Sequence, residues 1–200
     1  MAGGGDNLNL LENTVKVPDG FVYHENFVSQ SEEQELISEI RKLNLTPFKY
    51  YQFTGKRRTV SFGWEYEFGA RDITVAPETP EFLWPFRKRA GALFNIAPDS
   101  LVQTSVIEYS TGSPIGWHRD IPHFGAVVGI SLGSSCRMRF REYVRGRSNK
   151  AASRQKVLAI ELQPRSIYLM SGPARESWQH AIPPVKELRY AIMMRTVRGM

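Results

Sequence analysis

Short apolar runs, separated by glycine, serine and proline, dominate the second half of the chain. Such runs are typical of β-strands bounded by turns. They are Leu101 to Tyr109, Val127 to Leu132, Cys136 to Val144, Val157 to Leu162, Ile167 to Met170 and Leu188 to Val197. Because no helical segment interrupts them, the pattern favours a β-sandwich or barrel.

The first half of the chain alternates between strand and helix patterns. Phe21 to Tyr23 reads as a short strand, and residues 1–17 lack periodicity and are expected to form a flexible tail. From Ser31 onward the apolar side chains fall at helical spacing, and Ser31 with Gln34 forms a capping-box pattern. A second helix is predicted over Thr79 to Phe94, with Thr79 as its cap or with a later start near Pro85.

Aromatic residues are densest between these two helices. Phe62, Trp64, Tyr66 and Phe68 alternate with other residues, so one strand through them would carry an aromatic face. The basic triplet Lys56, Arg57 and Arg58 comes just before it. These aromatics either cover the barrel, or stack on a nucleic-acid base while the triplet meets phosphates. Trp64 is the candidate for stacking.

Composition narrows the class of protein. The chain of 200 residues has the length of one ordinary domain and a single cysteine, Cys136, which excludes an internal disulfide. No apolar run is long enough for a bilayer and no cleavable signal is evident, so a cytoplasmic protein is expected. The net charge is +6, and of the 26 basic residues 18 are Arg and 8 are Lys. Nucleic acid is therefore a plausible partner.

A polar loop between two predicted strands carries much of this charge. Its basic residues are Arg141, Arg145, Arg147, Lys150, Arg154 and Lys156. They are either scattered charge on a solvated connection or contacts to phosphates.

His118 and Asp120 form the strongest chemical signal. In an extended chain, residues i and i+2 project to one face about 7 Å apart, so both side chains can reach one ion. A second His completes the two-His, one-carboxylate set that suits non-haem Fe(II) and its oxygen chemistry. His180, in an alternating segment, is the candidate. His123 is the competitor, but Pro122 disturbs the strand and a third nearby ligand would crowd the loop.

The surrounding motifs give this set its meaning. Tyr109 and Gly112 precede His118, a glycine-rich apolar strand follows Asp120, and RYAIMMR holds Arg189 and Arg195. The series, from about Leu101 to Arg198, resembles the AlkB-like family of Fe(II)- and 2-oxoglutarate-dependent dioxygenases.

The resemblance implies a fold and a set of roles. The fold would be a double-stranded β-helix, a jelly-roll barrel, with flanking helices; residues 18–200 would form one domain, with helices and a substrate lid over 18–100 and the catalytic barrel over 101–198. His118, Asp120 and His180 would hold Fe(II), and O₂ would react there. Arg189 would pair with the distal carboxylate of 2-oxoglutarate, and Arg195 would lie near the metal-bound end of this cosubstrate. Tyr109 would donate a hydrogen bond to the cosubstrate.

Two departures bear on the substrate. Ile107 stands where the family often has an Asn that contacts the cosubstrate, and Ile121, Pro122 and His123 stand where DNA-repair members tend to have acidic residues.

We expect oxidative demethylation of alkylated DNA or RNA by a monomer. The alternatives are a dioxygenase acting on a protein side chain or small molecule, and a non-catalytic jelly-roll module that binds nucleic acid.

Overall fold

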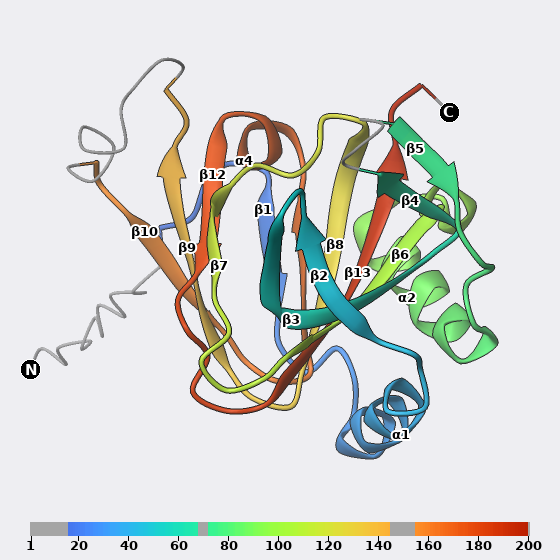
Figure 1. Ribbon diagram of the computed structural model, residues 1–200. Coiled ribbons are helices and arrows are strands. Elements are labelled where there is room, and N and C mark those ends of the chain that lie inside the picture. Colours follow the sequence, from blue (N-terminus) through green and yellow to red (C-terminus); the bar gives the residue numbers. More distant parts are fainter. Residues whose placement is uncertain (1–15, 68–71, 145–154, 200) are drawn as a thin grey trace, which may run out of the picture.

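Two antiparallel sheets face each other and make up most of the molecule (Figure 1). The computed structural model describes residues 16–67, 72–144 and 155–199. The larger sheet has seven strands in the order β1-β11-β8-β13-β6-β3-β2, the smaller one has four in the order β10-β9-β12-β7, and β4 and β5 form a separate pair. This arrangement confirms the predicted mainly-β, jelly-roll class.

The elements follow one another as follows. They are β1 (Phe21–His24), α1 (Gln30–Ile40), β2 (Thr46–Tyr50), β3 (Phe53–Phe62), β4 (Trp64–Glu67), β5 (Asp72–Val75), a 3₁₀ turn (Glu81–Leu83), α2 (Trp84–Phe94), a second 3₁₀ turn (Pro98–Ser100), β6 (Gln103–Tyr109), β7 (Ile115–His118), β8 (Phe124–Leu132), β9 (Cys136–Glu142), β10 (Leu158–Leu162), β11 (Ser166–Met170), α4 (Gly172–Glu176), β12 (Trp178–Ile182) and β13 (Arg189–Val197). No helix among these described residues is long and apolar enough to cross a bilayer.

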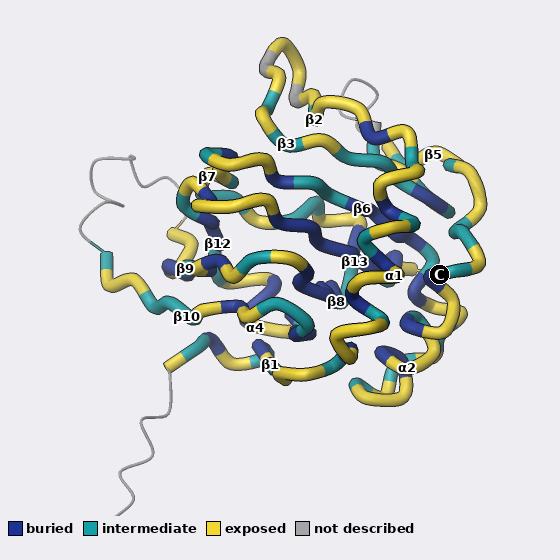
Figure 2. Tube along the Cα trace, turned by 90° about the horizontal axis from the view of Figure 1, so that it is seen from below, coloured by how far each residue is buried: buried dark blue, intermediate teal, exposed yellow. Residues whose placement is uncertain are grey.

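The two faces of the larger sheet bury two different apolar clusters, because side chains alternate along each strand. On β13, Tyr190, Ile192 and Met194 pack with residues of α1 and α2. Ala191 and Met193 point the other way, into a cluster shared with the smaller sheet. Figure 2 shows these buried stretches running along β6, β8 and β13. The second cluster forms the interior in which the candidate site lies.

Helix α1 is fixed to the sheets through one buried carboxylate. Glu33 accepts a hydrogen bond from the backbone N–H of Gly133 at 2.8 Å and another from Nη1 of Arg165 at 3.2 Å. The helix begins two residues before the predicted point, since Ser29 is the N-cap and forms the capping box with Glu32. The expected Ser31–Gln34 box was therefore wrong in position, although the motif was of the right kind.

Three further elements can be compared with the sequence prediction. The second helix begins at Trp84, with Pro85 in its first turn, so the predicted later start near Pro85 is confirmed and Thr79 is not its cap. The aromatic segment is not one strand, because Gly63 adopts a φ of +73° between β3 and β4. Helix α4 was not predicted. Phe68 and residues 145–154, which include most of the predicted basic loop, lie outside the described residues, as do residues 1–15 of the expected tail.

Candidate metal and cosubstrate site

Strand pairing brings His118 and His180 together from distant parts of the sequence. His118 ends β7 and His180 lies in the middle of β12, and the two are register partners in the antiparallel pair. Because directly opposed side chains project to the same face of a sheet, both imidazoles point into the interior. Asp120 follows β7 by two residues, so it shares that face with His118.

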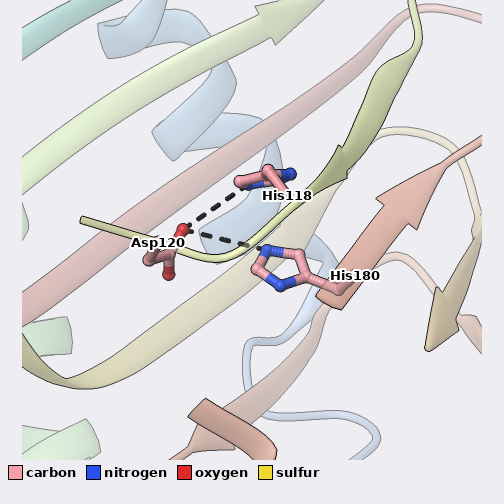
Figure 3. A group of neighbouring side chains, drawn as sticks. All are labelled: His118, Asp120 and His180. Atoms are coloured by element: carbon pink, nitrogen blue, oxygen red, sulfur yellow. Dashed lines mark ion pairs between the residues drawn. The ribbon is translucent and has the colours of Figure 1, made fainter. Parts of the chain in front are cut away.

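The three side chains converge on one point (Figure 3). One ligand atom from each residue lies within 4.8 Å of the other two. Oδ1 of Asp120 is 3.6 Å from Nε2 of His118 and 3.8 Å from Nε2 of His180. The predicted ligand set is thus assembled, whereas His123 and His24 do not belong to any such group among the described residues.

The protonation states suit a divalent metal. Nδ1 of His118 lies 2.9 Å from the backbone oxygen of Gly116, and a proton there would donate to that oxygen and leave Nε2 as a ligand. Burial raises the pKa of Asp120, but the adjacent imidazoles of His118 and His180 outweigh it and hold the pKa well below its usual range. Burial, with the charge of His118, lowers the pKa of His180 to about 3. An anionic carboxylate and a neutral imidazole result.

These residues fit Fe(II) by their chemistry. Two imidazoles and one carboxylate form the facial triad that leaves positions open for substrates of oxygen chemistry. Oδ2 of Asp120 is buried and has no hydrogen-bond partner among the described residues. A buried, unsatisfied carboxylate oxygen beside two imidazoles is well explained as part of a metal-binding group.

Arg189 is a cation buried in the same interior without an anion. Its side chain is 1% exposed, and its Nη2 donates a hydrogen bond to Oγ of Ser131 at 3.2 Å. Its Nε and Nη1 have no partner among the described residues, where no carboxylate pairs with it. The guanidinium carbon lies 4.9 Å from the ring of Tyr109, its register partner on β6. A carboxylate such as that of 2-oxoglutarate would satisfy these donors.

Arg195 lies at the other end of the same face of β13. Its Nη1 donates to Oε1 of Gln103 at 2.7 Å and to Oγ of Ser105 at 3.3 Å. Its positive charge lowers the pKa values of both Asp120 and His180. Ile107, at the position where the family often has Asn, packs into the cluster between the sheets.

Arg175 is a site residue that the sequence analysis did not select. It is 5% exposed on α4, and its Nη2 donates to the backbone oxygens of Ile121 at 2.5 Å and Phe124 at 3.0 Å. These contacts fix the loop that follows Asp120, and the charge of Arg175 lowers the pKa of His180. No motif distinguishes this arginine, because its role arises only from the approach of α4 to that loop.

The basic triplet does not form one surface. Alternation along β3 places Arg57 on the opposite face from Lys56 and Arg58. Arg57 is half-buried over the ring of Phe48, with 3.8 Å between guanidinium carbon and ring centroid. Arg58 forms a two-pronged ion pair with Glu108, at 2.8 and 2.9 Å, and Lys56 is exposed. The prediction of three phosphate contacts therefore needs revision: Arg57 faces inward beside Tyr109, and Arg58 already has a carboxylate.

Trp64 and Tyr66 lie on one face of the β4–β5 hairpin. Both are half-buried, and the ring of Tyr66 lies 5.5 Å from that of His123. His123 belongs to the loop after Asp120, so its place is explained by this aromatic contact and not by metal binding. The aromatic face of the hairpin thus meets the edge of the metal-binding loop. The remaining histidine, His24, packs against Phe94 with 5.9 Å between centroids.

Two relatives in sequence extend over most of the chain. The alkylated DNA repair protein ALKBH8 homolog of Arabidopsis thaliana is 28% identical over 195 residues, which cover 88% of this chain and 54% of that protein. The chain therefore spans about half the length of that relative. The uncharacterized protein L905 of Acanthamoeba polyphaga mimivirus is 26% identical over 174 residues, or 84% of this chain and 75% of that protein.

Two solved structures share the fold. One is OsALKBH1, with a TM-score of 0.66 and 16% identity over 90% of this chain and 98% of that one. The other is a prolyl-4-hydroxylase from Pseudomonas putida, with a TM-score of 0.62 and 11% identity over 90% of this chain and 93% of that one. At these identities the likeness describes the fold alone.

A family model extends over almost the whole described chain. The model of the 2OG-Fe(II) oxygenase superfamily matches residues 20–198. This match and the assembled ligand set argue against the non-catalytic module considered from sequence. The cosubstrates of the family are 2-oxoglutarate and O₂, and its metal is Fe(II). The chain belongs to the 2OG-Fe(II) oxygenase superfamily, in agreement with the predicted resemblance to AlkB-like dioxygenases.

Proposed function

We propose that this dioxygenase oxidatively demethylates N-alkylated bases of nucleic acid. The observation that carries the proposal is the contact between Tyr66 and His123, because it sets the aromatic face of the β4–β5 hairpin beside the metal-binding loop. A base extruded from its stack needs such a π-face to replace the stacking that it loses. The name of the Arabidopsis relative, an alkylated DNA repair protein homolog, supports the same substrate class.

The residues of this chain would hold and orient the reactants. His118, Asp120 and His180 would hold Fe(II), Arg189 and Tyr109 would bind the distal carboxylate of 2-oxoglutarate, and the rings of the hairpin would hold the base. Bound Fe(II) would supply the chemistry by which O₂ acts as the oxidant: 2-oxoglutarate, O₂ and a C–H bond give succinate, CO₂ and a C–OH bond. An N-hydroxymethyl group then loses formaldehyde and returns the N–H. The protein contributes position and the exclusion of water.

A second substrate class is favoured by one observation. Ile121, Pro122 and His123 follow Asp120, so no carboxylate stands there to balance a cationic alkylated base. A neutral methylated base, a protein side chain or a small molecule would not need one. The prolyl-4-hydroxylase shares the fold, and its name gives a different substrate class.

The test is release of succinate and formaldehyde from a panel of methylated oligonucleotides and methylated peptides. We expect both products from one or more oligonucleotides, and neither product from the His180→Ala variant. His123→Ala is the matched control, since it removes a nearby imidazole that lies outside the ligand set, and it should keep turnover. Turnover of peptides, with no turnover of oligonucleotides, would show that the substrate belongs to the second class and would overturn the proposed function. Turnover by His180→Ala but not His123→Ala would overturn the ligand assignment.

A further inference from the structure

The outer face of the smaller sheet carries arginines that the catalytic site does not use. His118, Phe140 and His180 point toward the larger sheet, so their sequence neighbours on β7, β9 and β12 point outward. We call Arg119, Arg137, Arg139 and Arg141 the arginine face. Three of them alternate along β9, and Arg119 follows β7, which is the edge strand of this sheet (Figure 1).

Aromatic rings hold three of these four guanidinium groups in place. The guanidinium carbons of Arg141 and Arg139 lie 4.5 and 5.2 Å from the ring centroid of Trp117. That of Arg119 lies 3.7 Å from the ring of Tyr143. A guanidinium stacked on a ring keeps its N–H edges free to meet a planar or tetrahedral anion. The stacking therefore prepares these side chains for anions before any ligand arrives.

The charge of this face is not balanced within the described chain. None of its four arginines forms an ion pair with a described residue, although Arg58, Arg87, Arg89, Arg165 and Arg198 each pair with a carboxylate. Glu161 stands opposite Arg137 across β9 and β10 but forms no ion pair with it. Four uncompensated cations on one face favour an anion.

Arg141 shows that the arrangement is built into the sheet. Its side chain is only 8% exposed, and its Nε donates to Oε1 of Gln179 at 2.8 Å. Arg119 likewise donates from Nη1 to the backbone oxygen of Glu176 at 3.0 Å. Burial and the adjacent charge of Arg139 both lower the pKa of Arg141. The folded chain thus holds like charges side by side, an arrangement that a bound anion would stabilise.

We propose that the arginine face binds the phosphodiester backbone of the nucleic acid on which the enzyme acts. Arginines two residues apart on the same face of a strand are about 7 Å from each other. A chain of repeating phosphates can therefore contact several of them at once. Because β7 is an edge strand with His118 inside and Trp117 outside, a nucleic-acid strand that crosses this edge runs from the site to the arginine face. The choice of nucleic acid among polyanions rests on the proposed function.

The test compares two double variants of equal charge. Arg137→Glu with Arg139→Glu reverses two cations of the arginine face. Arg41→Glu with Lys88→Glu reverses two exposed cations elsewhere, one directly after α1 and one on α2. The affinity for a labelled unmethylated single-stranded oligonucleotide is measured by fluorescence anisotropy over a range of salt concentrations. Thermal unfolding of each variant establishes that it is folded.

We expect the face variant to bind at least tenfold more weakly. Loss of two phosphate contacts should also flatten the slope of log K against log salt by about 1.4, at roughly 0.7 per contact for a single strand. The helix variant should keep both affinity and slope within a factor of about two, because its charges lie away from the backbone path. Equal weakening in both variants would show a general charge effect and overturn the proposal.

Other outcomes separate the two proposals. If the wild type demethylates oligonucleotides and the face variant binds them normally, the proposed function stands and the arginine face is not the docking surface. If oligonucleotide binding depends on the face but no methylated oligonucleotide is turned over, the face stands and the proposed function falls. Binding to vesicles containing phosphatidylserine, with none to oligonucleotides, would assign the face to a membrane surface and overturn the proposal.

Discussion

Arg189 is a buried cation that the described chain leaves without an anion. An unpaired charge in a protein interior costs several kcal/mol of stability, because the lost hydration is not replaced. Such a group persists where function needs it. The two donors of Arg189 without partners are therefore where we expect the distal carboxylate of the cosubstrate to bind.

We predict opposite effects of Arg189→Met on stability and binding. Without 2-oxoglutarate, the midpoint of thermal unfolding should stay the same or rise, since an uncompensated charge is replaced by an apolar chain of similar length. The dissociation constant of 2-oxoglutarate, titrated with a redox-inert divalent metal, should increase by about 30-fold or more, the equivalent of at least about 2 kcal/mol.

The control is Arg165→Met. Arg165 is ion-paired with Glu33 of α1, on the side of the larger sheet that this helix covers. This variant should lose stability and keep its affinity for 2-oxoglutarate. If Arg189→Met is destabilised as much and binds the cosubstrate normally, Arg189 is a structural residue.

A second prediction separates two adjacent arginines of β3. Arg57 faces the interior beside Tyr109, whereas Arg58 is on the other face and paired with Glu108. Burial lowers the pKa of Arg57, which is consistent with a cation that lacks a counter-charge. We expect Arg57→Ala to raise the KM for 2-oxoglutarate or for substrate at least fivefold, and Arg58→Ala to leave both within about twofold. Steady-state kinetics in both substrates decides, and equal effects would contradict this assignment.

Local spacing predicted some of these residues and missed others. His118 and Asp120 are two apart, so the strand period places them together, and the alternating segment around His180 indicated a strand. Spacing also separates Arg57 from its two neighbours, yet composition suggested a single basic patch. Arg175 has no periodic relation to the site, because its role depends on how α4 meets the loop after Asp120.

The β4–β5 hairpin is the element on which the substrate assignment depends. Gly63 ends β3 in a left-handed conformation, and a Cβ there would lie 2.0 Å from the backbone oxygen of Val102. Only glycine fits this approach, which turns the aromatic residues Trp64 and Tyr66 away from the line of β3. The sequence prediction of one continuous strand failed at this point because alternation alone does not reveal a positive φ.

We predict that Trp64→Ala lowers turnover on methylated oligonucleotides by tenfold or more. The expected loss is about 1 to 3 kcal/mol, the stacking energy of one base on one ring. Binding of 2-oxoglutarate should be retained. Trp84→Ala is the control, since Trp84 is 43% exposed on α2, outside the hairpin. Initial rates for both variants test the idea, which falls if the two lose activity equally.

The elements that were predicted best are those whose hydrophobic pattern continues over many residues. The main strands of both sheets appear near the expected residues, because runs of β-branched and apolar side chains fit a buried strand. The five-residue helix α4 and the start of α1 were not predicted or were misplaced. A short helix has too few turns for a periodic signal, and Ser29 and Ser31 offer two possible caps, between which the capping contact with Glu32 decides.

At the scale of the whole molecule, the two sheets contribute different groups of functional side chains. The larger sheet carries Arg189 and Arg195 on its inner face and is covered by α1 and α2 on the other. The smaller sheet carries both histidine ligands on its inner face and the arginine face outside. The unpaired described arginines fall mainly into these two places. No single strand pattern predicts this division, since it depends on which sheet each strand joins.

The place of β7 at an edge has a consequence for local unfolding. Among described strands, β7 pairs with β12 alone, and the pairing shifts between His180 and Ile182. A strand held on one side opens more readily than one held on both, so its amide hydrogens should exchange with solvent at a lower free energy than those of β13. A metal bound by both His118 and His180 would link β7 to β12. The free energy of metal binding would then add to the free energy needed to unfold β7 locally.

Chelation of the metal should therefore speed amide exchange in Ile115–His118 by tenfold or more, with little change in Arg189–Val197 at the centre of the larger sheet. Hydrogen–deuterium exchange followed by mass spectrometry, before and after chelation, measures both segments in one sample. The His180→Ala variant should exchange rapidly in β7 with or without metal. Uniform protection of β7 in all three samples would mean that the edge is held by its backbone alone, and that iron enters a strand already fixed in place.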